Sequence, residues 1–148
     1  MPPEEIKFRI LYTMYCQHFK SGGLANATDR GIAIEAGLED VDPNELRSEI
    51  DSLTKNGFLK IGGRGESGYQ LFIGIETSGI EIVQNIADKS MESIPSEIKD
   101  EQFQAKLEDI FSEKDTTEKT KRFFDLALQH KMIAKHVFDV VEQQLFDS

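Results

Sequence analysis

The chain has 148 residues, of which 39% are hydrophobic and 30% are charged, a composition that excludes wholesale disorder. Its longest apolar run, "LFIGI", is far shorter than the roughly 20 residues needed to cross a bilayer. The single cysteine, Cys16, excludes a disulfide framework and a cysteine-built zinc site.

The amino-terminal sequence and the spread of charge bear on location and partners. "MPPEEIKFRI" is acidic and amphipathic, so we expect no signal peptide and a soluble, cytoplasmic protein without a membrane partner. The net charge of −10 is distributed along the whole chain, and no basic arm is visible. Such a balance repels nucleic acid at long range, although it leaves room for a local basic face.

Apolar spacing predicts three helices before residue 57. The first begins near residue 4 and ends at the glycines of segment 21–23, which can take a left-handed cap conformation. Thr28 can cap a short second helix that stops at Gly37. Asp42 followed by Pro43 predicts the start of a third helix, because proline at the first helical position loses no needed hydrogen bond. The inward face of this helix consists of Leu46, Ile50 and Leu53.

A β-hairpin and a fourth helix are predicted next. Segments 58–61 and 69–75 are rich in β-branched and aromatic residues, and the glycine-rich segment 62–68 separates them. Alternation places Tyr69, Leu71, Ile73 and Ile75 on one face of the second strand. The chain then turns at 76–79 into a helix with the core positions Ile80, Val83 and Ile86.

Three short motifs give this order of elements a family resemblance. "GIAIEAGL" is similar to the second helix and turn of winged helix-turn-helix proteins. Their third helix and its exit into the first wing strand are matched by Leu46, Ile50, Leu53 and Gly57-Phe58-Leu59. "ETSGIEIV" resembles the "LTxxGxxxV" that follows the wing in many such regulators, and the likeness covers about residues 5–88.

The resemblance implies an α+β, mostly α fold and a domain organisation. Residues 1–90 would form a winged helix-turn-helix domain, with three helices, a β-hairpin wing and a fourth helix. One departure concerns the connection between Gly37 and Leu46, which is about three residues longer than the usual tight turn. The relative angle of the second and third helices therefore has to come from the structure.

The same resemblance implies a small transcription regulator of archaeal or bacterial type that binds double-stranded DNA. Polar side chains on the outward face of the third helix suit base edges and phosphates. A cation on the wing suits a minor-groove or phosphate contact, and the start of the second helix can clamp phosphate. The expected DNA-binding residues are Thr28, Arg30, Asn44, Arg47, Ser48, Lys55 and Arg64.

Acidic residues around the third helix support an alternative. Residues 35–51 contain seven acidic groups and one basic group, a surface that opposes the usual electrostatic affinity for DNA. Arg47 could be held in an ion pair by a neighbouring acid such as Asp51, four residues on. The alternative function is a winged-helix module that contacts another protein and does not bind DNA.

Residues 91–148 are predicted to form a carboxy-terminal α-helical dimerisation segment, and the boundary before it lies in a polar connection at 89–98. One helix is expected at 103–111, and a final helix of about eight turns at 116–146. The final helix carries two apolar seams, which predict packing in a homodimer or, alternatively, within one subunit. The seam expected at the dimer interface consists of Phe123, Leu126, His130, Ile133, Val137 and Val140.

Nothing in the sequence favours catalysis or a bound group. His18, His130 and His136 are too scattered for metal-ligand spacing. The glycine-rich segment 62–68 lacks a phosphate-loop lysine and precedes a strand rather than a helix. No pair of carboxylates stands out from the acidic background. We therefore expect no enzymatic activity, no metal and no cofactor.

Overall fold

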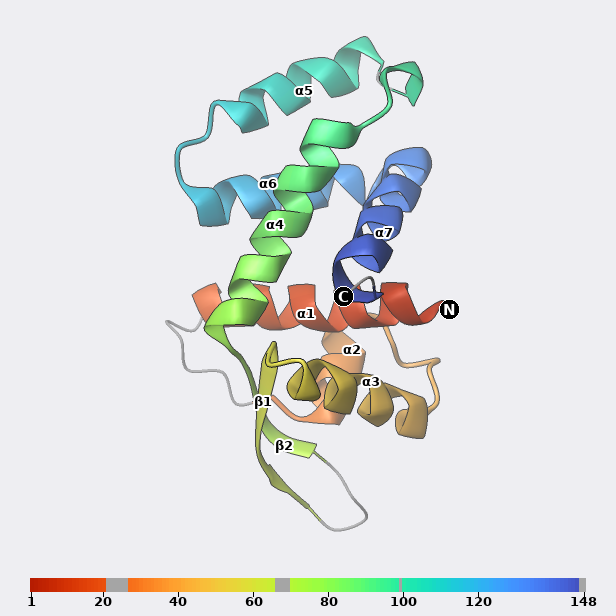
Figure 1. Cartoon of the computed structure of the whole chain (residues 1–148), viewed down its shortest axis with the longest axis vertical. Helices are drawn as coiled ribbons and strands as arrows, with labels where there is room; N and C mark the ends of the chain where they lie inside the picture. Colours follow the sequence, from red (N-terminus) through yellow and green to blue (C-terminus); the bar gives the residue numbers. More distant parts are fainter. Residues whose placement is uncertain (21–26, 66–69, 99, 147–148) are drawn as a thin grey trace. The chain divides into compact units, whose positions relative to one another are not determined.

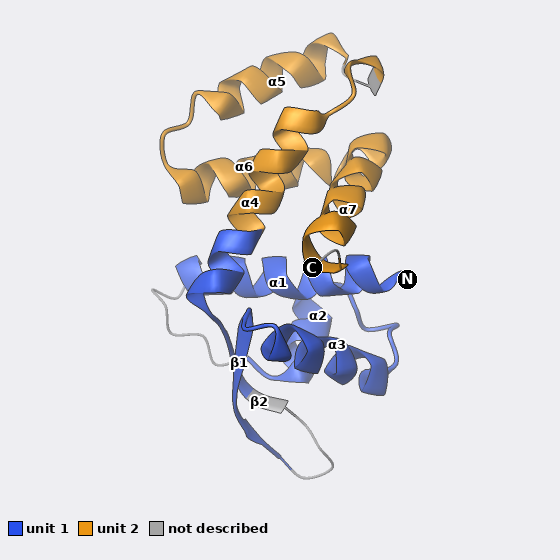
Figure 2. Ribbon diagram, in the orientation of Figure 1, with its two compact units in different colours: residues 1–82 blue, residues 83–148 orange. Residues whose placement is uncertain are grey.

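The structure, a computed structural model, describes residues 1–20, 27–65, 70–98 and 100–146. These residues form seven α-helices and one antiparallel hairpin, so the chain is α+β and mostly helical, as predicted (Figure 1). The chain divides into two compact units, residues 1–82 and 83–148 (Figure 2). The boundary lies inside helix α4, Thr77–Ser93, and so before the predicted boundary at residue 90. The predicted polar connection at 89–98 is wrong in its first half, because α4 continues to Ser93 and buries Ser90 and Met91.

Three helices open the first unit: α1 (Pro3–Lys20), α2 (Asp29–Glu35) and α3 (Pro43–Lys55). Both predicted amino-terminal caps are present, because Thr28 Oγ1 accepts a hydrogen bond from the Gly31 backbone N–H at 3.0 Å and Asp42 Oδ1 accepts one from that of Asn44 at 2.8 Å. After α3 the chain reverses at Gly57, whose φ of +82° suits glycine. The predicted end of α1 at 21–23 lies outside the described residues.

The hairpin consists of β1 (Leu59–Arg64) and β2 (Gln70–Ile75), which pair antiparallel with Leu59 opposite Ile75. Ile73 and Ile75 are buried on one face, as the alternation predicts. Ile73 also pairs through its backbone with Ala27, which ties the hairpin to the segment before α2. The predicted turn lies partly outside the described residues, and so do the side chains of Tyr69 and Leu71.

The core of the first unit is built around α1. This helix packs on α2, α3 and β2, and it buries residues along its length rather than on a narrow stripe. The predicted inward face of α3 is confirmed, because each of its three residues is no more than 4% exposed. The fully buried residues of α1–α3 and their connections include Ile10, Leu11, Met14, Tyr15, Ile32, Leu38, Ile50 and Leu53.

The second unit consists of helices and short turns. After α4 come a 3₁₀ turn (Ser96–Ile98), α5 (Glu101–Phe111), α6 (Thr116–Ala127) and α7 (Lys131–Phe146). Asp100 and Asp115 cap α5 and α6. Arg122 of α6 donates hydrogen bonds to Asp109 at 2.5 Å and to Glu113 at 3.4 Å. The hydrogen bond to Asp109 is the main cause that raises the pKa of Arg122.

The prediction of one continuous helix over 116–146 is wrong. The helix ends at Ala127, and a new one begins at Lys131 after a turn in which His130 N–H donates to the Ala127 carbonyl at 3.1 Å. The sequence between them contains neither glycine nor proline, so it carries no local signal of a break. After the break, α7 runs in a different direction from α6, and both helices bury apolar side chains (Figure 1).

The apolar seam assigned to a dimer interface is largely buried within the single chain. Phe123, Ile133 and Val137 are each 0% exposed and Val140 is 5% exposed, while Leu126 and His130 are half-buried. Their burial corrects the basis of the dimer prediction, because a side chain already in the core of its own chain cannot face a second copy. The alternative, packing within one subunit, accounts for this seam.

Candidate interaction site on the first unit

The polar side chains predicted to contact DNA do not form a continuous basic face. Thr28, Arg30, Asn44, Ser48 and Lys55 are exposed. The Thr28 hydroxyl accepts the capping hydrogen bond of α2, and Asn44 Oδ1 accepts one from the guanidinium of Arg47 at 3.3 Å. Some of the side chains expected to contact phosphates or bases therefore already form hydrogen bonds within the protein.

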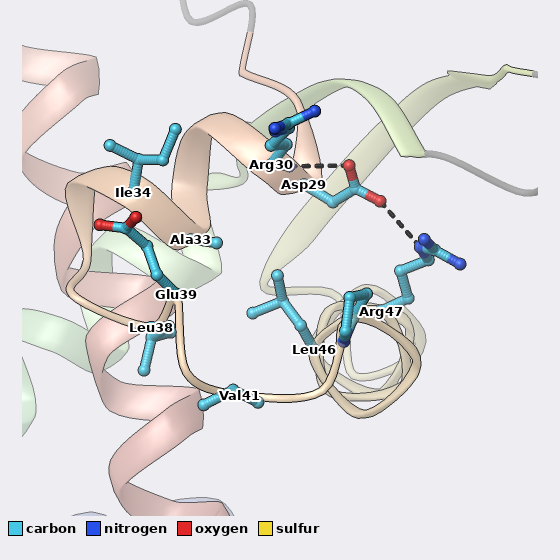
Figure 3. Close-up of a pocket in the computed structure, with 10 residues that line it drawn as sticks. Asp29, Arg30, Ala33, Ile34, Leu38, Glu39, Val41, Leu46 and Arg47 are labelled. Carbon is cyan, nitrogen blue, oxygen red and sulfur yellow. Dashed lines mark hydrogen bonds and ion pairs between the residues drawn. The ribbon is translucent and has the colours of Figure 1, made fainter.

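Arg47 is held by Asp29 in an ion pair that joins α3 to α2 (Figure 3). Arg47 Nε lies 3.0 Å from Asp29 Oδ2, and the side chains of Arg47 and Asp29 are only 20% and 5% exposed. The other carboxylate oxygen of Asp29 accepts the backbone N–H of Arg30 at 2.7 Å. From the sequence, Asp51 was given as an example of a neighbouring acid that could pair with Arg47, whereas the ion pair described here is with Asp29. Asp29 lies 18 residues earlier in the chain, so spacing along one helix could not identify it.

Asp51 pairs with the hairpin. Arg64 Nη2, at the end of β1, lies 2.7 Å from Asp51 Oδ1 on α3. Both side chains are about half exposed, at 51% and 43%. Solvent therefore screens this pair, and it fixes the position of the guanidinium more than it stabilises the fold. Two of the predicted DNA-binding arginines, Arg47 and Arg64, thus each form an ion pair with a carboxylate.

The acids of segment 35–51 fall into two groups. Glu49 faces inward and pairs with the buried Lys7 of α1, and Asp51 pairs with Arg64. The others are exposed and lie at the end of α2, in the α2–α3 connection and at the start of α3. This acidic rim consists of Glu35, Glu39, Asp40, Asp42 and Glu45.

A hollow of about 340 Å³ opens between α2 and α3 beside the Asp29–Arg47 pair (Figure 3). Its polar lining residues are Asp29, Arg30, Glu39 and Arg47. Its apolar lining residues are Ala33, Ile34, Leu38, Val41, Pro43 and Leu46. The long α2–α3 connection forms part of the wall, where the Val41 N–H donates to the Leu38 carbonyl at 3.1 Å. The extra length of this connection was the sequence signal that could have pointed to the hollow.

A second hollow, of about 550 Å³, lies between α3 and β1 and is polar in character. Lys55 and Thr54 of α3 and Arg64 of β1 line it, together with Asp51 and the backbone of the glycines at 62–63. Ammonium, guanidinium and hydroxyl groups are the side-chain groups that contact phosphate. The carboxylate of Asp51 opposes this character, since it already accepts a hydrogen bond from Arg64.

Comparison with protein-family models, with curated proteins and with solved structures finds no match to this chain. Within the described ranges, no three His, Cys, Asp or Glu side chains are grouped so that they could hold a metal ion. No helix among the described residues is long and apolar enough to cross a membrane. Function is therefore inferred from the two hollows and the charges around them.

Proposed function

We propose that the first unit is a winged-helix protein-interaction module that contacts its partner through α2 and α3. The observation that carries this proposal is the hollow between these helices, with its apolar walls and its acidic rim. Ile34, on the edge of the hollow, leaves 58% of its surface exposed, so it adds accessible apolar area to the apolar walls.

Electrostatics favour a protein over DNA at this surface. To contact a base, Arg47 would have to leave Asp29, and that carboxylate would then remain almost fully buried without its guanidinium. The exposed acids of the rim repel phosphates at the same time. A protein partner meets neither cost, because it can contact the hollow while the Asp29–Arg47 pair stays intact.

Site-specific photo-crosslinking in cells that make the protein tests the proposal. A photoreactive amino acid replaces Ile34 in one variant and Glu45 in a second. A third variant carries it at Met132 of α7, which is 58% exposed like Ile34 and so provides a matched control. We expect the same protein to be crosslinked from residues 34 and 45, to be absent from residue 132, and to bind again when both proteins are purified. Crosslinks to nucleic acid alone, or none from either position, would overturn the proposal.

A second candidate function is DNA binding by a winged helix-turn-helix regulator, and the polar hollow between α3 and β1 favours it. Lys55 and Arg64 place two cations on its walls, and Ser48 is exposed on α3. With so few cations per chain, we expect weak binding, a shallow dependence on salt, and duplexes retained only at low ionic strength.

Fluorescence anisotropy with labelled duplexes at about 50 mM salt tests this second candidate. Lys55→Ala and Arg64→Ala should each weaken binding of all sequences alike and lower the salt slope by about one. Lys135→Ala, an exposed lysine of α7, is the control and should change nothing. If genomic and random duplexes both fail to bind at tens of micromolar protein, DNA binding is excluded.

A further inference from the structure

We infer that the hollow between α2 and α3 receives a basic protein segment anchored by one large apolar side chain. This inference rests on the proposed function, since it names the chemistry of the partner at the same site. It follows from the size of the hollow, the character of its walls and the charge around it.

The size and walls of the hollow indicate an apolar anchor. Its volume of about 340 Å³ is at the lower end of the roughly 300–1,000 Å³ typical of ligand pockets, so it suits one or two side chains. Leu38 and Leu46 form apolar wall that is almost fully buried, at 0% and 4% exposed. Above this buried floor, a leucine, phenylalanine or methionine from a partner would cover the exposed apolar surface of Ile34, Val41 and Pro43.

The rim indicates a basic partner. No lysine or arginine occurs between residues 31 and 46, the segment that holds all five exposed acids of the rim. Two cationic side chains line the hollow, and one of them, Arg47, forms an ion pair with Asp29. Complementary charges across an interface raise the association rate and select between partners. Lysines and arginines beside the anchor would therefore be attracted to the rim, while acidic flanks would be repelled.

Acidic and basic side chains are not spread evenly around the hollow, and their positions predict the orientation of the bound segment. Figure 3 shows Arg30 and Asp29 at one end of the hollow and Val41 at the other. The exposed Asp40 and Asp42 flank Val41 in sequence. The basic residues of the partner are thus expected beside the α2–α3 connection, and not at the end that carries Arg30.

Binding of synthetic peptides to the full chain tests this inference. The probe is a short fluorescein-labelled peptide with a central leucine flanked by lysines and arginines. Two matched peptides replace the leucine with serine, or the basic residues with glutamate. We expect the first peptide to bind and each matched peptide to bind at least about tenfold more weakly, the ratio that about 1.4 kcal/mol produces.

Variants of the protein assign the binding to the hollow. Ile34→Asp should lower the affinity for the basic peptide at least about tenfold, whereas Met132→Asp, at an equally exposed residue, should not. Glu39→Lys combined with Glu45→Lys should lower it as well, whereas Glu142→Lys on α7 should not. Circular dichroism of each variant checks that the fold is retained, which the exposure of all these side chains favours.

Three outcomes would overturn the inference: equal binding of the basic and acidic peptides, no loss with Ile34→Asp, or an equal loss with Met132→Asp. Its failure can be told apart from failure of the proposed function. If no peptide binds but residue 34 still crosslinks to a protein, the interaction module stands and the partner has a different chemistry. If neither peptides nor crosslinks are found, both proposals fall.

Discussion

Arg47 Nε of α3 lies 3.0 Å from Asp29 Oδ2 of α2, and the two side chains are shielded from most of the solvent. The pair joins two helices that the chain separates by an unusually long connection. It also holds Arg47 in place, the arginine of α3 that the sequence analysis expected to contact DNA. Its strength can be compared with that of the Arg64–Asp51 pair, which is exposed.

The Asp29–Arg47 pair should contribute measurably to stability. Arg47→Ala leaves a carboxylate that is only 5% exposed without its guanidinium, so we expect the free energy of unfolding to fall by about 1–3 kcal/mol. Arg64→Ala, which breaks the exposed pair, should cost less than about 1 kcal/mol. Urea denaturation measures both. In a double-mutant cycle with Asp29→Ala the coupling should exceed about 0.5 kcal/mol, and a coupling near zero would contradict the assignment.

The buried pair between Lys7 of α1 and Glu49 of α3 gives a second prediction. Their side chains are 7% and 15% exposed, so Lys7→Ala should lower the free energy of unfolding by about 3 kcal/mol. The double variant Lys7→Met/Glu49→Leu should recover most of the loss, because apolar residues of similar size need no partner. Arg9→Ala on the same helix breaks the more exposed pair with Glu5 and a hydrogen bond to the Ala36 carbonyl at 3.4 Å, and it is the control, at about 0–1 kcal/mol. Equal losses for Lys7→Ala and Arg9→Ala would count against this account.

The substitution Gly79→Ala should destabilise the protein, although Gly79 lies in a helix. Replacing glycine by alanine in an open helix stabilises it by about 1 kcal/mol. At Gly79 a Cβ atom would overlap the Phe58 carbonyl oxygen and lie 2.7 Å from Ile75 Cγ1. We therefore expect Gly79→Ala to lower the thermal midpoint of unfolding and to reduce the free energy of unfolding by about 1–3 kcal/mol. A Cβ at Gly63 meets no described heavy atom within 4 Å, so Gly63→Ala is the control; a stabilised Gly79→Ala variant would contradict the packing described.

The burial of the seam in the second unit predicts the state of assembly. Multi-angle light scattering at low micromolar concentration should give the mass of one chain, 16.8 kDa. Val137→Asp should unfold the second unit rather than divide a dimer, because Val137 is 0% exposed and an unpaired carboxylate there costs several kcal/mol. Met132→Asp, at an exposed position of the same helix, should leave the helix content unchanged. A mass of two chains that falls to one in Val137→Asp while helix content is kept would restore the dimer interpretation.

Local chemistry in the sequence determined much of the first unit. Thr28 and Asp42 cap the helices that their side chains predict, and Gly57 ends the third. The alternation that buries Ile73 and Ile75 is visible in the sequence as well. These features were predictable because they depend on a few neighbouring residues: a cap, a left-handed turn, or a period of two.

Only the tertiary structure decided the break after Ala127 and the partners of the charged side chains. The apolar seams run through residues 128–130 without glycine or proline, so local propensity favours one helix, and burial of both halves in a shared core outweighs it. Arg47 meets an acid that lies 18 residues away on another helix. The sequence by itself determined which residues cap, turn and alternate. Which carboxylate an arginine meets, and whether an apolar seam faces its own chain or another, depends on distances that only folding sets.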